Sequence, residues 1–256
     1  TFRPGTRPVT RTWLVDPQVK IPDGAAAIHG ITTERAQAEA THTPEQMLFE
    51  LTGLIARGLG QDIPLVAFNA AYDITLLESE NLRHQVDTLK SRMRRGNISP
   101  VIDPHVLDKQ FSRRKGSRTL VDVCAHYGVI HTGAHDAAGV AIATGRLVPL
   151  VMASAGAAKE KVQHYSPVIL HQAQVEWRAQ QKDSLRGYLH RAGKPQDWCC
   201  GSWPLDLDLD CHCVGSCVDR GASCRPRSRR RCRPPPDPGP PLEGVARAPA
   251  HNRRSR

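Results

Sequence analysis

Two long stretches of the chain are predicted to be helices, and apolar residues recur at helical spacing in the first of them. The first begins at Thr43, where a capping threonine, a proline and a glutamine at the third helical position are typical of a helix start. The second covers residues 167–190 and follows Ser166, another capping residue. Both stretches are predicted helices, and the apolar face of the first consists of Leu48, Leu51, Leu54, Ile55 and Leu59.

Short uninterrupted apolar runs stand between the helical stretches. Residues 64–68 and 101–102 are predicted strands that are buried on both faces, as in a parallel or mixed sheet. A helix over residues 71–80 is predicted to follow the first of them. Because strands and helices alternate along the chain, the pattern favours an α/β fold.

Weaker signals complete the pattern. Residues 10–15 contain β-forming side chains and predict a short strand, whereas residues 21–32 read as a loop. Further helices are predicted over residues 119–127, which Gly128 would end, and over residues 135–148.

The chain changes character after Leu205. Residues 206–256 are rich in Arg, Pro, Gly and Cys and contain few apolar side chains, a composition that cannot bury a core and predicts disorder. Three parts are therefore expected: a folded domain over 1–151, a helical extension over 152–205 and a disordered C-terminal tail over 206–256.

Basic residues exceed acidic ones, and the formal net charge of +10 suits a polyanionic partner such as nucleic acid. The excess is unevenly distributed, because residues 206–256 hold 11 Arg and 6 acidic residues. Half of the positive excess thus lies in the tail.

The sequence gives no signal for a membrane partner. Its longest apolar stretch, from Leu147 to Ala158, is interrupted by Pro149 and Gly156 and is shorter than the roughly 20 residues of a membrane-spanning helix. Residues 1–12 do not read as a signal peptide, and the missing initiator Met suggests a chain cut at its N-terminus. A cytoplasmic location is therefore expected.

Two polar residues occupy positions where sheets and helices present chemistry. Asp73 follows the strand at 64–68 and falls in the first turn of the next helix, and His135 begins a helix after a glycine-containing loop. Each has a purely structural alternative, because acidic side chains favour the first helical turn and histidines also serve as caps or core residues.

Taken in order, several segments resemble the DEDDh 3′–5′ exonuclease superfamily, the DnaQ-like family that includes DNA polymerase III epsilon, in an actinobacterial form. The segments are IHGIT at 28–32, FNAAYD at 68–73, VIDPHVLD at 101–108, RTLVDVCAHYGV at 118–129 and GAHDAAGVAIAT at 133–144. The likeness covers about residues 10–151.

This resemblance implies a ribonuclease-H-like exonuclease fold, a mixed sheet flanked by helices, with its first strands missing here. It also implies two-metal hydrolysis with Mg²⁺ or Mn²⁺ at the 3′ end of single-stranded DNA or RNA. By position, Asp73 matches a metal ligand and His135 the general base, while His29 and Asn69 match residues close to the terminal nucleotide. Polymerase or repair partners are left open.

The chain also departs from the family pattern. The Asp-x-Glu motif belongs upstream of residues 28–32, and Ile28 lies too close to the beginning of the chain to leave room for it. Val140 occupies the last carboxylate position, and Asp136, one helical turn lower, is a poor replacement. Hydrolysis is therefore expected to be impaired, and the alternatives are a non-catalytic nucleic-acid-binding relic or the product of a shifted reading frame.

Other candidate residues have less specific patterns. Asp103 and Asp108 are interpreted as structural, and the basic run Arg113-Arg114-Lys115 with Arg118 predicts either a grip on phosphates or a solvated loop. In the tail, a zinc site is weighed against a shifted reading frame and is disfavoured by the spacing of Cys211, His212, Cys213, Cys217, Cys224 and Cys232.

Overall fold

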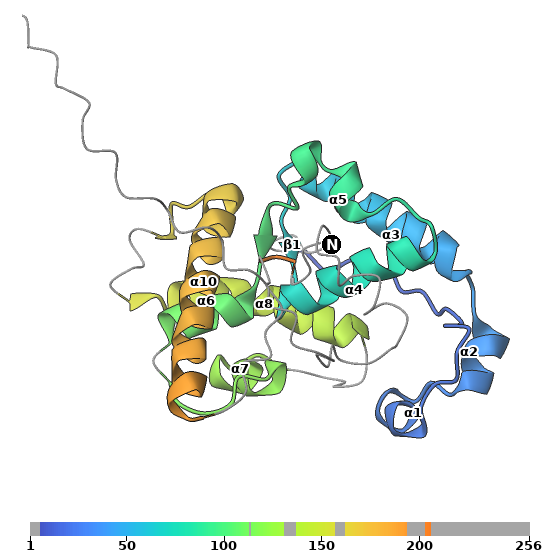
Figure 1. The fold of residues 1–256 in the computed structure, drawn as a ribbon, viewed down its shortest axis with the longest axis horizontal. Coiled ribbons are helices and arrows are strands. Elements are labelled where there is room, and N and C mark those ends of the chain that lie inside the picture. Colours follow the sequence, from blue (N-terminus) through green and yellow to red (C-terminus); the bar gives the residue numbers. More distant parts are fainter. Residues whose placement is uncertain (1–5, 113, 131–136, 157–161, 194–202, 206–256) are drawn as a thin grey trace, which may run out of the picture. The chain divides into compact units, whose positions relative to one another are not determined.

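The computed structural model describes residues 6–112, 114–130, 137–156, 162–193 and 203–205. The predicted tail and His135 lie outside these residues. In chain order the described elements are α1 (Asp23–His29), α2 (Thr33–Glu39), α3 (Pro44–Leu59), β1 (Leu65–Val66), α4 (Ala70–Arg83), α5 (Leu89–Arg92), η1 (Arg94–Gly96), β2 (Val101–Ile102), α6 (Pro104–Phe111), α7 (Leu120–His126), α8 (Ala137–Ala153) and α10 (Pro167–Arg191) (Figure 1).

The two strands form a parallel sheet, as the sequence predicts. Leu65 is paired with Val101 and Val66 with Ile102. The amide of Leu65 donates to the carbonyl of Pro100 at 3.0 Å and the amide of Ala67 to that of Ile102 at 3.2 Å. The described residues therefore combine a parallel sheet with helices, and helices predominate.

Helices cover both faces of this sheet. Consecutive side chains of a strand point to opposite faces, so the contacts of Val101 and Ile102 show what packs on each face. Val101 packs in a cluster with apolar side chains of α3, α4 and α5, whereas Ile102 packs in a second cluster with side chains of α6, α7, α8 and α10. Each cluster buries residues from elements far apart in the chain, so the short sheet is held mainly by what packs against it.

Helix α10 closes the edge of β2 that faces away from β1. The amide of Val101 donates to Nδ1 of His171 at 3.2 Å. Gln174 accepts from the amide of Asp103 at 2.8 Å and donates to the carbonyl of Val101 at 3.1 Å. Two polar side chains thus supply the hydrogen bonds that a further strand would give.

The helix starts predicted from the capping residues Thr43 and Ser166 are confirmed. Thr43 forms a capping box with Gln46, and the Ser166 side chain accepts from the amide of Ile169. Thr119, which was not predicted as a cap, forms a second capping box with Asp122. Gly128, in the left-handed region at φ 67°, follows α7 as predicted. These caps satisfy amides that have no partner within their own helices.

Several local predictions are wrong. Residues 10–15 form no strand beyond one isolated bridge between Val15 and His42, because no neighbouring strand extends the pairing. Residues 21–32, expected as a loop, contain α1, and the predicted face of α3 leaves Leu54 38% exposed. Within the described part of the chain, no helix combines the length and the apolar character that crossing a membrane requires.

Candidate functional site

The carboxyl ends of β1 and β2 meet at one edge of the sheet, because the strands are parallel. Asn69 follows β1 and directly precedes α4, and Asp103 follows β2 and directly precedes α6. In open α/β sheets, ligands bind outside the carboxyl ends of the strands. This edge is therefore where chemistry is expected.

Asp103 ties the two helix starts together. Its carboxylate accepts from the amide of Asn69 at 2.9 Å, from that of Ala70 at 3.0 Å and from that of His105 at 2.9 Å. The side chain is buried, and burial raises the pKa of Asp103 while these three amides oppose the rise. The structural role predicted for Asp103 agrees with these contacts, because its oxygens are occupied by backbone donors.

Asn69 stands in the left-handed region, with φ 59° and ψ 47°, at the turn from β1 into α4. Asparagine adopts this conformation at lower cost than most residues. Its own side chain forms no cap for α4 and is exposed, so its amide remains available to a ligand at the edge. Asn69 therefore has both a backbone role and a surface position.

Asp73 lies in the first turn of α4, as predicted, and its residue is exposed. Partial burial raises the pKa of Asp73, although its side chain still reaches solvent. The carboxylate can thus accept a hydrogen bond from a ligand at this edge.

His105 belongs to the same edge and was not predicted as a site residue. Its ring packs against Phe68 with 5.2 Å between centroids, and its Nδ1 is buried without a hydrogen-bond partner in the described part of the chain. Burial, followed by the charges of Lys109 and Arg178, lowers the pKa of His105 to about 4. The imidazole is therefore neutral at pH 7, and its burial beside two cations was not readable from the segment VIDPHVLD.

Two basic side chains accompany His105. Burial and then the charge of Arg178 lower the pKa of Lys109, and Nε of Arg178 is buried with no partner among the described residues. Arg178 also acts electrostatically on Asp103. Two cations therefore lie close to His105, while the Asp103 carboxylate already occupies the amides at the starts of α4 and α6.

The other predicted site residues are not brought to this edge. His29 ends α1, a helix without a buried residue, and its Nδ1 accepts from the amide of Ile31 at 3.2 Å. His135 and Asp136 lie outside the described residues. Val140 is half-buried in α8, where its carbonyl accepts from the Thr144 hydroxyl at 2.8 Å.

Two arginines of the basic run after α6 hold the fold together. Arg114 and Arg118 are only 16% exposed at their side chains and form ion pairs with the buried carboxylate of Asp108. Tyr127 donates to the same carboxylate at 3.0 Å. The solvated-loop alternative is therefore wrong for these two arginines, whereas Lys115 is exposed as that alternative expects; Arg113 lies outside the described residues.

The described residues do not fit a two-metal site. Asp103 is occupied by three amides and Asp108 by two arginines and a tyrosine, which leaves Asp73 without a second free carboxylate that the structure places beside it. In the part of the chain described here, no three His, Cys, Asp or Glu side chains gather in a metal-binding arrangement. Metal ions usually need several such ligands at once.

Comparison of the chain with protein-family models, with curated proteins and with solved structures finds no match in any of the three.

Proposed function

We propose that the chain is a protein of the DEDDh 3′–5′ exonuclease type, with a ribonuclease-H-like fold, that binds the 3′ end of single-stranded DNA or RNA and hydrolyses it poorly. One observation carries the proposal. Asn69 and Asp73 begin α4 directly after a parallel strand, at the sheet edge where the resemblance places the terminal nucleotide.

The chemistry of this edge fits a strand end. Lys109 and Arg178 attract a phosphate. The Asp73 carboxylate can accept a hydrogen bond from a free 3′-hydroxyl, which only a strand end offers. Phosphate attraction thus supplies affinity, and Asp73 supplies the preference for an end.

Poor hydrolysis follows from one matched position. The family reaction uses several carboxylates to hold its two metal ions, and Val140 stands at the last carboxylate position that the resemblance assigns. An apolar side chain there supplies no ligand, and metal bonds demand accurately placed ligands. The proposal therefore includes no step through a metal ion.

End recognition is tested by competition between linear and circular DNA of one sequence. We expect the full chain to bind the linear strand several-fold more tightly, and Asp73→Ala, which removes the acceptor, to abolish this preference. Asp23→Ala is the matched control, because Asp23 also occupies the first turn of a helix but belongs to α1. The 11 arginines of residues 206–256 contact phosphates on both DNAs alike. Equal binding of the two DNAs would refute end recognition.

Poor hydrolysis is tested separately with 3′-labelled single strands and Mn²⁺. We expect the full chain to release no more label than a His135→Ala variant. Faster release by the unaltered chain would show that a functional metal site exists, while leaving the result of the competition experiment intact.

A further inference from the structure

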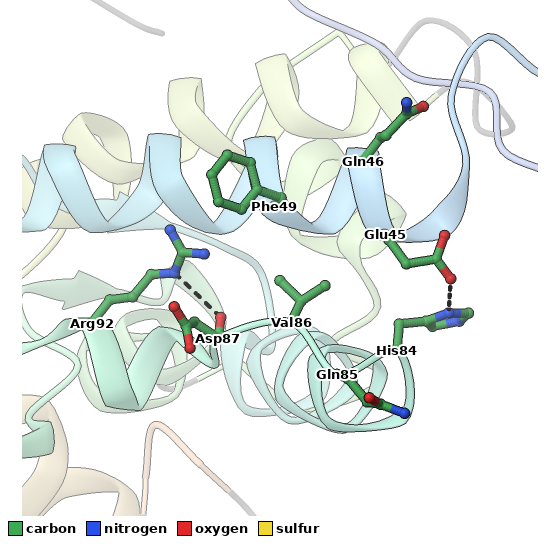
Figure 2. Close-up of a pocket in the computed structure, with 8 residues that line it drawn as sticks. All are labelled: Glu45, Gln46, Phe49, His84, Gln85, Val86, Asp87 and Arg92. Atoms are coloured by element: carbon green, nitrogen blue, oxygen red, sulfur yellow. Dashed lines mark hydrogen bonds and ion pairs between the residues drawn. The ribbon is translucent and has the colours of Figure 1, made fainter.

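An open pocket of about 510 Å³ lies away from the sheet edge, between α3, the segment after α4, and α5 (Figure 2). Phe49 comes from α3, Val86 and Asp87 from the segment after α4, and Arg92 from α5. The pocket is shallow and open to solvent, so it suits one unit of a longer ligand better than an enclosed small molecule.

The middle of the pocket is apolar. Phe49 is 62% exposed, and Figure 2 shows its ring and the side chain of Val86 bordering the same space from different elements. A large exposed aromatic ring presents a flat face on which a planar group can stack. Such a face suits a nucleobase better than an aliphatic chain, because stacking is available to any base.

One end of the pocket is cationic. The guanidinium carbon of Arg92 lies 5.1 Å from the centroid of the Phe49 ring, and its Nε donates to the carbonyl of Asp87 at 3.3 Å. Nη2 of Arg92 is buried and has no hydrogen-bond partner in the described part of the chain. A buried donor without an acceptor costs about 1–3 kcal/mol, so an acceptor supplied by a ligand is favoured there.

A second arginine lies close to Arg92, although it does not line the pocket itself. Nη1 of Arg57 and Nη1 of Arg92 both approach Gly53, whose missing side chain leaves them room. Among the described residues, neither arginine forms an ion pair with an acidic side chain. Two neighbouring cations without acidic partners repel each other, and a phosphate between them relieves the repulsion.

The charge is distributed unevenly along the pocket. Two acidic residues line it, Glu45 and Asp87. Glu45 is bound by Nδ1 of His84 at 2.8 Å and lies at the end away from Arg92 (Figure 2). Arg92 and the neighbouring Arg57 therefore attract an anion at their own end of the pocket.

We propose that this pocket binds one nucleotide of a single-stranded nucleic acid, with the base stacked on Phe49 against Val86 and a phosphate held by Arg92 and Arg57. The pocket shares no residue with the sheet edge, so this inference extends beyond recognition of a 3′ end. An acidic peptide would satisfy the arginines but would leave the aromatic face unused.

A circular oligothymidylate with one 5-iodouracil, irradiated with the full chain, tests the site, because this base crosslinks to aromatic side chains on which it stacks. We expect a crosslink at Phe49, lost in Phe49→Ala and kept in Tyr188→Ala, a matched change at an exposed ring of α10. Arg92→Gln should lower the crosslinked fraction at least about fivefold, unlike Arg186→Gln in α10.

The circular probe has no 3′ end, so failure of end recognition leaves this result unaffected. Thermal unfolding of each variant verifies that it folds like the unaltered chain. Crosslinks only at residues outside the pocket would overturn the proposal. The same crosslinking reaction is also run with unlabelled competitors: an abasic strand, polyglutamate and a base-containing strand. Equal suppression of the Phe49 crosslink by the abasic strand and by polyglutamate would overturn the proposal, whereas suppression by the base-containing strand alone would support it.

Discussion

Gln174 stands beside Val101 where a neighbouring strand would stand. Its Nε2 donates to the carbonyl of Val101 at 3.1 Å, and its Oε1 accepts from the amide of Asp103, one residue beyond β2, at 2.8 Å. Nε2 also donates to the carbonyl of Leu170 at 3.1 Å. A single amide from α10 therefore satisfies three buried backbone groups.

We expect Gln174→Ala to lower the free energy of unfolding by about 2–4 kcal/mol, because it leaves buried backbone groups without hydrogen-bond partners and creates a cavity. Urea unfolding followed by circular dichroism measures the loss. Gln172→Ala is the matched control, since Gln172 is exposed on the same helix, and we expect a change within about 0.5 kcal/mol. Equal effects of the two changes would contradict the edge-closing role of Gln174.

The elements that the sequence predicted correctly are those whose signals are local. The start of α3 is determined by Thr43, Pro44 and Gln46, which are adjacent in the chain. The two apolar runs became paired strands because both lie between helices that cover them. The closing of β2 by His171 and Gln174 was not predictable, since it joins residues about 70 positions apart.

Stability should depend on pH through His105. The pKa of its ring is lowered from 6.5 to about 4, first by burial and then by Lys109 and Arg178, with Arg118 adding to them and Asp108 opposing. Between these values the unfolded chain binds a proton that the folded chain does not, so stability is lost as pH falls. We expect a loss of up to about 3 kcal/mol between pH 7 and pH 4 from this group.

The contribution of His105 is isolated by comparing urea unfolding of the unaltered chain and His105→Asn at several pH values. Asp73 and Glu78, whose pKa values are raised by burial, and His171, whose pKa is lowered, titrate in both proteins and cancel in the difference. The variant should lose less stability on acidification. Parallel curves for the two proteins would show that His105 does not titrate as described.

Asp108 should be essential for stability. Its carboxylate is buried and accepts from Tyr127, Arg114 and Arg118, so Asp108→Ala leaves two partly buried cations without a counter-charge. We expect a loss of about 3–5 kcal/mol in the free energy of unfolding. The exposed pair of Asp183 and Arg186, 3.0 Å apart, provides the control: Asp183→Ala should cost less than about 1 kcal/mol. A similarly small cost for Asp108→Ala would mean that its ion pairs with Arg114 and Arg118 do not stabilise the fold.

The candidate site was predicted in part. Asp73 and Asn69 were identified because a polar residue after an apolar run marks the carboxyl end of a strand, a relation within one short segment. His105 follows β2 in the same manner, but its neutrality depends on Lys109 and on Arg178, which lies on α10. Sequence spacing does not show that α10 brings Arg178 close to His105 and Lys109 of α6.

Asn69 allows the backbone and ligand roles of one residue to be separated. At φ 59° and ψ 47° a side chain with a β-carbon is strained, and glycine is not, so we expect Asn69→Gly to change stability by less than about 0.5 kcal/mol and Asn69→Ala to lose about 1 kcal/mol.

Both variants remove the side-chain amide. If this amide contacts the terminal nucleotide, both should weaken the preference for linear over circular DNA by the same factor despite their different stabilities. Asn97→Ala is the control, because Asn97 is exposed at φ −92° and should change neither property. A preference that follows stability, unchanged in Asn69→Gly and reduced only in Asn69→Ala, would mean that Asn69 serves the turn into α4 alone.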